Sequence, residues 1–188
     1  MNSIFNTYSN EIIKEIEKTI KKIDNSCVLE LMDQMVSNQR IFVAGAGRTG
    51  LVMRSFAMRL MHLGFRVHII GDTTTPSIDE KDILLIGSGS GNTSSLVSIS
   101  ENAKEIGVST ILFTIDSSSI IGRLASINIC IPAPSPKLER KTNNHSVQPM
   151  GSLFEQSLMI VLDTLIWMLM LRKGIDSKTM FKNHANLE

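Results

Sequence analysis

The stretch Ile41-Phe-Val-Ala-Gly45-Ala-Gly47-Arg-Thr-Gly50 joins a short apolar run to a glycine-rich turn. A short apolar run that ends in glycines is typical of a buried strand. The next residues, Leu51–Leu63, repeat apolar side chains at helical spacing and end at Gly64, a common helix terminator. The same order of strand, glycine-rich turn and helix returns over Asp82–Ile106. The chain is therefore predicted to build strand–helix units.

This alternation extends through the rest of the chain. Strands are predicted over Arg40–Ala44, Arg66–Ile70, Asp82–Ile86, Thr110–Thr114 and Ile127–Ile131. Helices are predicted over 3–24, Val28–Val36, Leu51–Leu63, Thr93–Ile106, Ile120–Ala125, Ser152–Arg172 and 177–183, with a long loop over Pro132–Gln148. Because apolar strands separated by helices form parallel sheets covered on both faces, we expect an α/β fold. It is a three-layer αβα sandwich with a five-stranded parallel sheet, flavodoxin-like, in residues 40–188, preceded by an N-terminal helical extension in residues 1–39.

Composition limits the function classes. The 188 residues are 43% hydrophobic and carry a formal charge of +1, with 5% aromatics. This charge balance argues against nucleic-acid binding, which favours a basic excess. The apolar stretch Leu158–Leu171 is shorter than the roughly 20 residues that span a bilayer. With a polar N-terminus and two well-separated cysteines, Cys27 and Cys130, predicted as buried thiols, we expect a soluble cytoplasmic protein without membrane contact.

The first glycine-rich turn has two interpretations. Gly45-Ala-Gly-Arg-Thr-Gly50 matches the G-x-G-x-x-G pattern of dinucleotide sites, and Asp72 lies where an acidic side chain would bind a ribose hydroxyl. This pattern favours a nicotinamide-dependent dehydrogenase. A tight strand-to-helix turn also selects glycines, so the pattern fits a purely structural role equally well. Arg48, inside the turn, can reach an anion.

The second turn indicates a phosphate site. Ser88-Gly-Ser-Gly-Asn-Thr93 follows one predicted strand and precedes one predicted helix. Its glycines allow close approach of the backbone, its hydroxyls can donate to phosphate oxygens, and the N–H groups of the next helix point the same way. This combination suits a phosphate monoester of a small molecule. A flexible loop with Thr93 as the helix N-cap is the structural alternative.

Five segments together carry a resemblance to a known family. They are Gly45–Gly50, Phe56–Phe65, Thr73–Pro76, Ser88–Thr93 and Pro149–Glu155. These segments resemble the 6-phospho-3-hexuloisomerases, which belong to the sugar isomerase (SIS) domain family. The serine–glycine loop is typical of the whole family, whereas Phe56–Phe65 and Pro149–Glu155 are more particular to the isomerases. The one departure is Thr49, where the family commonly has serine, and the hydroxyl is kept.

The resemblance implies an activity and a set of site residues. It implies an isomerase that interconverts D-arabino-3-hexulose 6-phosphate and fructose 6-phosphate through an enediol, in the ribulose monophosphate pathway. The implied catalytic residues are Glu155, as the base, and His184. The expected substrate-binding residues are Gly47, Arg48, Thr49, Ser88, Gly89, Ser90, Gly91, Asn92 and Thr93. The family needs no cofactor or metal, forms homotetramers, and works with 3-hexulose-6-phosphate synthase as its metabolic partner.

The same residues also fit other interpretations. Ser152-Leu-Phe-Glu155 also matches an S-x-x-E capping box, in which the glutamate binds the backbone N–H of Ser152. His184 also fits an exposed residue of a terminal helix. Besides a dehydrogenase or another phosphosugar isomerase of the family, the domain could be a sugar-phosphate sensor. The 39 residues before the first strand hold 4 basic and 6 acidic residues, a poor DNA-binding arm.

Overall fold

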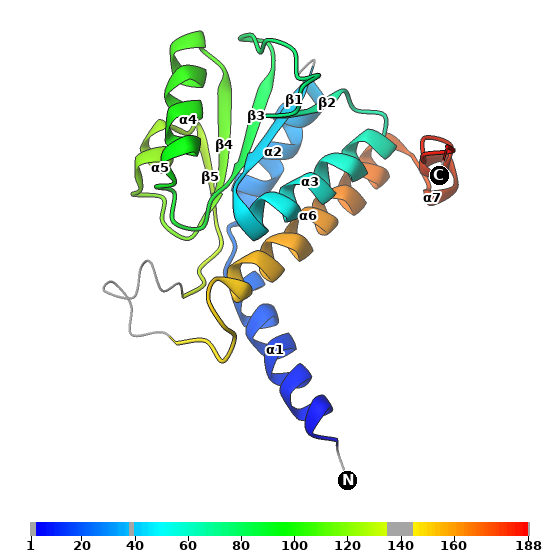
Figure 1. The fold of residues 1–188 in the computed structure, drawn as a ribbon. Coiled ribbons are helices and arrows are strands. Elements are labelled where there is room, and N and C mark those ends of the chain that lie inside the picture. The colour runs from blue at the N-terminus through cyan, green and yellow to red at the C-terminus, as the bar shows by residue number, and fades with distance from the viewer. Residues whose placement is uncertain (1–2, 38–39, 135–144, 188) are drawn as a thin grey trace.

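Five strands form one all-parallel sheet in the order β2-β1-β3-β4-β5 (Figure 1). The computed structural model describes residues 3–37, 40–134 and 145–187. The strands are β1 (Ile41–Gly45), β2 (Val67–Ile69), β3 (Ile83–Gly87), β4 (Ser109–Thr114) and β5 (Ile127–Cys130). The helices are α1 (Ile4–Ile20), α2 (Asn25–Ser37), α3 (Gly47–His62), α4 (Ser94–Ile106), α5 (Ile120–Leu124), α6 (Ser152–Lys173) and α7 (Ser177–Phe181).

The two faces of the sheet carry separate apolar cores, because successive strand residues point to opposite sides. Ile41 and Val43 of β1 pack in the core that contains α2, α3 and α6. Phe42 and Ala44 pack in the core beneath α4 and α5. The predicted α/β sandwich with a five-stranded parallel sheet is confirmed. The division into an extension and a domain stays a prediction, although α2 contributes buried Leu31 to the main core.

Most helix and strand boundaries lie within a few residues of the predicted ones, with one instructive difference. Helix α3 begins at Gly47, inside the glycine-rich turn, whereas the sequence predicted a start at Leu51. Gly47 has φ +57°, a left-handed conformation that suits glycine and lets the chain enter the helix directly from the strand. Residues 135–144 of the predicted long loop lie outside the described residues.

Helix α6 is the longest helix of the described residues and is strongly apolar. It is 22 residues long and meets the length and composition expected of a membrane span, but half of its most apolar window is buried inside the protein. Leu158, Leu162, Leu165 and Leu169 recur at helical spacing and are buried in the main core. Helix α6 is therefore a core helix of the domain.

Helix α1 packs on α6 and extends away from the sheet (Figure 1). Ile4, Phe5, Tyr8 and Ile13 leave much of their apolar surface exposed on it. Among the two cysteines, Cys27 is half-buried and Cys130 is exposed, and both are free thiols. The prediction of two buried thiols is therefore wrong for Cys130, because β5 ends there at the edge of the sheet.

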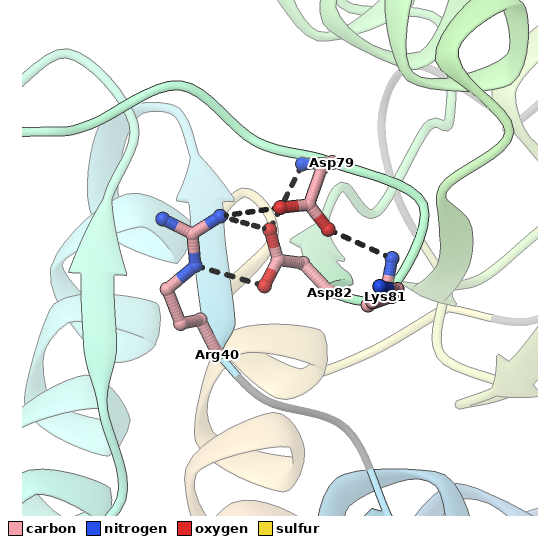
Figure 2. A network of polar contacts seen from close by, with 4 residues as sticks. All are labelled: Arg40, Asp79, Lys81 and Asp82. Carbon is pink, nitrogen blue, oxygen red and sulfur yellow. Dashed lines mark hydrogen bonds and ion pairs between the residues drawn. The ribbon is translucent and has the colours of Figure 1, made fainter.

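A charged cluster fixes the opposite, amino-terminal ends of β1 and β3 (Figure 2). Arg40 Nε donates to Asp82 Oδ1 at 2.9 Å and its Nη2 donates to Asp82 Oδ2 at 2.6 Å. Asp82 is completely buried, and it also accepts from the backbone N–H of Asp79 at 2.9 Å. A bidentate pair of this kind locks the start of two neighbouring central strands to the loop that precedes β3.

Candidate active site

Both glycine-rich turns lie side by side at the carboxyl end of the sheet. Gly45 of β1 and Gly87 of β3 are register partners, so the turns that follow them are neighbours. The chain leaves β1 toward β2 on one side and reaches β3 on the other, which makes this the switch point where ligands of open α/β sheets bind. A Cβ on Gly50 would lie 2.6 Å from the Gly45 carbonyl oxygen. The two outer glycines of the motif thus permit close packing of α3 on β1.

A cavity of about 320 Å³ opens between the two turns and the start of α6. Its lining includes backbone and side chains of the first turn, the serine–glycine loop and the first residues of α6. Eight predicted site residues line it together: Gly47, Arg48, Thr49, Ser88, Gly89, Ser90, Thr93 and Glu155. A space of this size suits a small molecule, since ligand pockets begin at about 300 Å³.

The serine–glycine loop is built to receive an acceptor. The Ser88 side chain is buried, and its hydroxyl has no hydrogen-bond partner in the described structure. Thr93 occupies the N-cap position of α4, but its side chain makes no capping hydrogen bond. The first N–H groups of a helix have no partners within the helix and carry partial positive charge. The loop therefore presents hydroxyl and backbone donors to one side of the cavity.

Two predicted residues of this loop shape it and do not line the cavity. Gly91 has φ +60°, and a Cβ there would lie 1.9 Å from Ser119 Oγ. The Asn92 side chain donates to the carbonyl of Ser90 at 2.9 Å and accepts from the backbone N–H of Ile120 at 3.0 Å. These contacts hold the loop against α5 and keep Ser88 and Ser90 at the cavity.

Glu155 faces the serine–glycine loop from α6. Its carboxylate is mostly buried, with 17% of the side chain exposed, and Oε2 lies 3.1 Å from Nη1 of Arg48. The same Nη1 donates to Ser152 Oγ at 2.8 Å. Neither side chain of the predicted capping box caps the helix, because the N-cap is Gly151 and the Ser152 N–H donates to the carbonyl of Pro149. The capping alternative for Glu155 is wrong, and the carboxylate is directed at the cavity.

The rest of the lining is apolar and was not assigned from the sequence. Its largest members are Leu96, Ile115, Met150 and Phe154. Met150 and Phe154 belong to the quoted segment Pro149–Glu155, so their place in that motif was the available signal. Ile115 follows β4 and carried no signal, since it reaches the cavity only through the pairing of β3 with β4. The cavity thus has a polar end at the loop and an apolar wall beside Glu155.

Comparison with known proteins agrees with this geometry. Residues 34–163 match the SIS domain family model. The chain belongs to the SIS domain family. It is 46% identical over 181 residues to a 3-hexulose-6-phosphate isomerase of Bacillus subtilis, covering 96% of this chain and 97% of that one. A 3-hexulose-6-phosphate isomerase of Mycobacterium gastri is 43% identical, covering 93% and 86%.

A solved structure supports the same placement within the SIS family. A protein from Methanococcus jannaschii, whose structure was used to infer the function of a 3-hexulose-6-phosphate isomerase, has a TM-score of 0.83 and is 32% identical. The match covers 97% of this chain and 99% of that one. The resemblance to the 6-phospho-3-hexuloisomerases is thus confirmed over nearly the full length. The extent of the match includes α1, α2 and α7 as well as the sheet.

His184 is the one predicted catalytic residue that this SIS domain does not bring to the cavity of its own chain. Its ring stacks on His62, with ring centroids 5.5 Å apart, at the far end of α3. Arg48 begins α3 and His62 ends it, which separates them by about 20 Å along the axis. Burial and the charge of Arg59 lower the pKa of His62 below its ordinary value.

The dinucleotide alternative finds no support in this SIS domain. Asp72, which would bind a ribose hydroxyl, is ion-paired with Arg54 of α3 at 2.8 Å. The outer glycines of the motif are accounted for by the packing of α3 on β1. Within residues 3–37, 40–134 and 145–187, no three His, Cys, Asp or Glu side chains gather where they could hold a metal ion.

Proposed function

We propose that this chain is a 3-hexulose-6-phosphate isomerase that interconverts D-arabino-3-hexulose 6-phosphate and fructose 6-phosphate. The observation that carries the proposal is the position of the Glu155 carboxylate in the cavity that the serine–glycine loop also lines. Relatives named for this activity match nearly the whole chain at up to 46% identity.

The reaction moves a carbonyl from C3 to C2 through an enediol. A base removes the proton from C2 while the C3 carbonyl oxygen gains a proton, which gives the enediol with a C2–C3 double bond. A proton is then returned to C3 while the C2 hydroxyl loses its proton and becomes the carbonyl. One carboxylate can serve both carbons, because they share a face of the planar intermediate. Glu155 is the residue we propose for this role. The reaction has no net redox change, so it requires no external oxidant or reductant.

Phosphate binding is the role that we propose for the serine–glycine loop. Ser88, Ser90 and Thr93 supply hydroxyls, and the first turn of α4 supplies backbone N–H groups and a favourable dipole. Gly47, Thr49 and Gly89 line the same cavity and allow the sugar phosphate to approach the backbone. Gly91 and Asn92 act through the shape of the loop. A phosphate held here fixes the sugar so that C2 and C3 lie toward Glu155.

Arg48 connects the two functions of the cavity. Its guanidinium contacts Glu155 and Ser152, and about half of its side chain is exposed to the cavity and solvent. An arginine beside the reacting carbons orients the carboxylate and can stabilise the negative charge that develops on the enediol oxygens. We therefore propose Arg48 as the oxyanion-stabilising group. Its five N–H donors allow it to keep its hydrogen bond to Ser152 while it contacts the substrate.

The assembly and cellular setting follow from the same proposal. The exposed apolar side chains of α1 and α6, such as Phe5, Tyr8 and Trp167, favour a homo-oligomer, which we propose to be a tetramer. In such an assembly we propose that His184 acts at a neighbouring subunit's cavity. The substrate is a phosphorylated ketohexose, which we expect 3-hexulose-6-phosphate synthase to supply in the cytoplasm.

The direct test is an assay of purified protein with D-arabino-3-hexulose 6-phosphate, with fructose 6-phosphate detected by a coupled enzyme. We expect turnover in both directions without added cofactor. In deuterated water the product should carry solvent deuterium, because a carboxylate exchanges its proton during the lifetime of the enediol. Absence of turnover in a folded preparation would contradict the proposal. If the protein turned over only a different phosphoketose, the proposed substrate would be wrong and the proposed reaction class would stand.

A further inference from the structure

Three hydrogen bonds join α1 to the segment that leads into α6. The carboxylate of Glu15 accepts from Ser146 Oγ at 2.7 Å and from Gln148 Nε2 at 3.0 Å, both at Oε2. Its Oε1 accepts from the backbone N–H of Val147 at 3.0 Å. Residues Ser146–Gly151, here named the pre-α6 segment, are thus bound to a residue more than 130 positions earlier in the chain.

Glu15 is well suited to hold this segment as an anion. Burial raises the pKa of its carboxyl, but the hydrogen bonds from Ser146, Gln148 and Val147 outweigh burial and lower the pKa below its ordinary value. Hydrogen bonds to an ionised carboxylate are about twice as strong as those between neutral groups. The three bonds therefore persist at neutral pH.

The pre-α6 segment needs an external anchor. Val147 and Met150 are largely exposed, so apolar burial contributes little to its conformation. Gln148 is its one buried side chain, and the only partner described for the Gln148 amide group is Glu15. Met150 has φ +57°, a conformation that costs a non-glycine residue free energy and persists only where neighbouring contacts fix the backbone.

The segment ends at the cavity. Met150 and Gly151 line it, and the Pro149 carbonyl accepts from the N–H of Ser152 at 3.1 Å, so the turn runs directly into α6. Glu155 lies one helical turn further, and its backbone N–H donates to the Gly151 carbonyl. A shift of the segment would therefore move Met150 in the cavity and the first turn of α6 that carries Glu155.

We infer that Glu15 is a positioning residue of the active site, which acts through the pre-α6 segment to fix Met150 and the first turn of α6. The inference rests on the proposed function, because it assigns Glu15 to the placement of the proposed base. Glu15 itself does not line the cavity. The start of α6 is then held from two sides, by Arg48 of α3 and by Glu15 of α1.

The test compares Glu15→Ala with Glu17→Ala, a control on the same helix whose carboxylate pairs with exposed Lys21. The phosphate loop is untouched in both variants. We therefore expect Glu15→Ala to lower kcat at least about tenfold while KM changes less than about threefold, since a misplaced base costs transition-state stabilisation and not ground-state binding. Glu17→Ala should stay within twofold of the unmodified protein in both constants.

A double-mutant cycle separates positioning from general loss of stability. Gln148→Ala removes the same connection from the segment side, so its loss in kcat should not add to that of Glu15→Ala. If Glu15→Ala does not fold, Gln148→Ala alone tests the inference, because it removes the same connection. Additive losses, or equal kcat in Glu15→Ala and Glu17→Ala, would overturn the inference.

Hydrogen exchange provides a readout that needs no activity. Amides in residues 145–155 should exchange faster in Glu15→Ala than in the unmodified protein, and Glu17→Ala should leave them unchanged. Equal exchange in the two variants would also overturn the inference. An unmodified protein that does not turn over the 3-ketose would contradict the proposed function instead, and the exchange data would still decide the role of Glu15.

Discussion

Glu155 illustrates how a tertiary partner decides the role of a residue. Its sequence context, Ser152-Leu-Phe-Glu155, fits a capping box. In the structure both polar side chains contact Arg48 at the cavity instead of capping the helix. The N-cap position falls on Gly151, which has no side chain that could compete. The carboxylate is thereby mostly shielded from water and placed beside a cation, which suits a base that must act on a carbon-bound proton.

Glu155→Gln tests this role at the residue scale. The amide keeps the size of the side chain but cannot accept a proton from carbon, so we expect kcat to fall at least about 100-fold. The melting temperature should hardly change, because the helix cap does not use this side chain. Asp163→Asn, an exposed carboxylate of the same helix, is the control and should leave kcat unchanged. Wild-type activity of Glu155→Gln would remove Glu155 as the base.

Ser88 supports a second prediction, because its buried hydroxyl has no partner within the described protein. Ser88→Ala loses no internal hydrogen bond, so the free energy of unfolding should stay the same or rise slightly. A lost hydrogen bond to the charged phosphate costs about 1.5–3 kcal/mol, so KM should rise roughly 10-fold or more with little change in kcat. Steady-state kinetics and urea unfolding measure both effects.

The matched control for Ser88 is Ser157→Ala. Ser157 is also completely buried and its hydroxyl is also unpartnered, but it does not line the cavity. We expect Ser157→Ala to leave KM unchanged. If Ser88→Ala and Ser157→Ala both had the KM of the unmodified protein, the loop would not bind the phosphate through Ser88.

At the scale of elements, local patterns predicted the helices and strands well because each is bounded by glycine or polar turns. The placement of eight predicted residues at one cavity could also be predicted from the sequence, since the carboxyl ends of parallel strands meet at one edge of the sheet. Contacts between elements far apart in the chain could not be predicted from the sequence. Neither the bonds of Glu15 to Ser146 and Gln148 nor the pairing of Arg48 with Glu155 leaves a periodic signal in the sequence.

The contact of the serine–glycine loop with α5 gives a prediction about packing. A Cβ on Gly91 would overlap Ser119, whose hydroxyl caps α5 by accepting from the N–H of Gly122. Gly174 has nearly the same φ, +62°, but nothing lies within 4 Å of a Cβ there. Alanine at Gly174 should cost about 1 kcal/mol from backbone strain alone. Alanine at Gly91 should cost a further 1–3 kcal/mol, approximately, from overpacking.

Urea unfolding of Gly91→Ala and Gly174→Ala measures this difference directly. We also expect KM to rise in Gly91→Ala only, because a displaced Ser119 shifts the loop that holds Ser88 and Ser90. Equal losses of stability in the two variants would show that the loop accommodates the methyl group without moving α5.

The charged cluster at the amino-terminal ends of β1 and β3 predicts a pH dependence of stability (Figure 2). Burial raises the pKa of Asp82, but hydrogen bonds from Arg40 and Asp79 outweigh burial and lower it below 3.8. A carboxyl whose folded pKa is lowered stabilises the protein above its unfolded pKa. This contribution disappears as the pH falls through the folded pKa.

Asp82→Asn isolates this contribution. At pH 7 the variant should lose about 1.5–3 kcal/mol of the free energy of unfolding, because charged hydrogen bonds to Arg40 are weakened. The difference from the unmodified protein should shrink progressively below about pH 4. Urea unfolding at several pH values checks this. A difference that is independent of pH down to pH 2 would contradict the assignment to the Asp82 charge.

At the scale of the whole molecule, one chain presents its cavity and its His184 at opposite ends of α3. The ring of His184 rests on His62 and Phe181, at the end of α3 remote from Arg48. The apolar side chains exposed on α1 and α6 provide surfaces for self-association. A symmetric assembly repeats each contact, so every cavity can receive the same residue from a neighbour. For this protein we expect a mass of about 83 kDa by light scattering, from four copies of the 20.8 kDa chain.

Complementation between two inactive variants tests whether His184 acts across subunits. Glu155→Gln and His184→Ala should each be nearly inactive alone if both residues are catalytic. When the two chains are refolded together in equal amounts, half of all cavities contain a native Glu155. If the histidine comes from a neighbour, half of those receive a native His184, so about a quarter of the unmodified activity should return. If both residues act within one chain, no mixed assembly holds an intact site and activity stays at the level of the separate variants. Unchanged activity of His184→Ala alone would instead show that the stacked ring serves the docking of α7, and that Glu155 works with Arg48 and without a histidine.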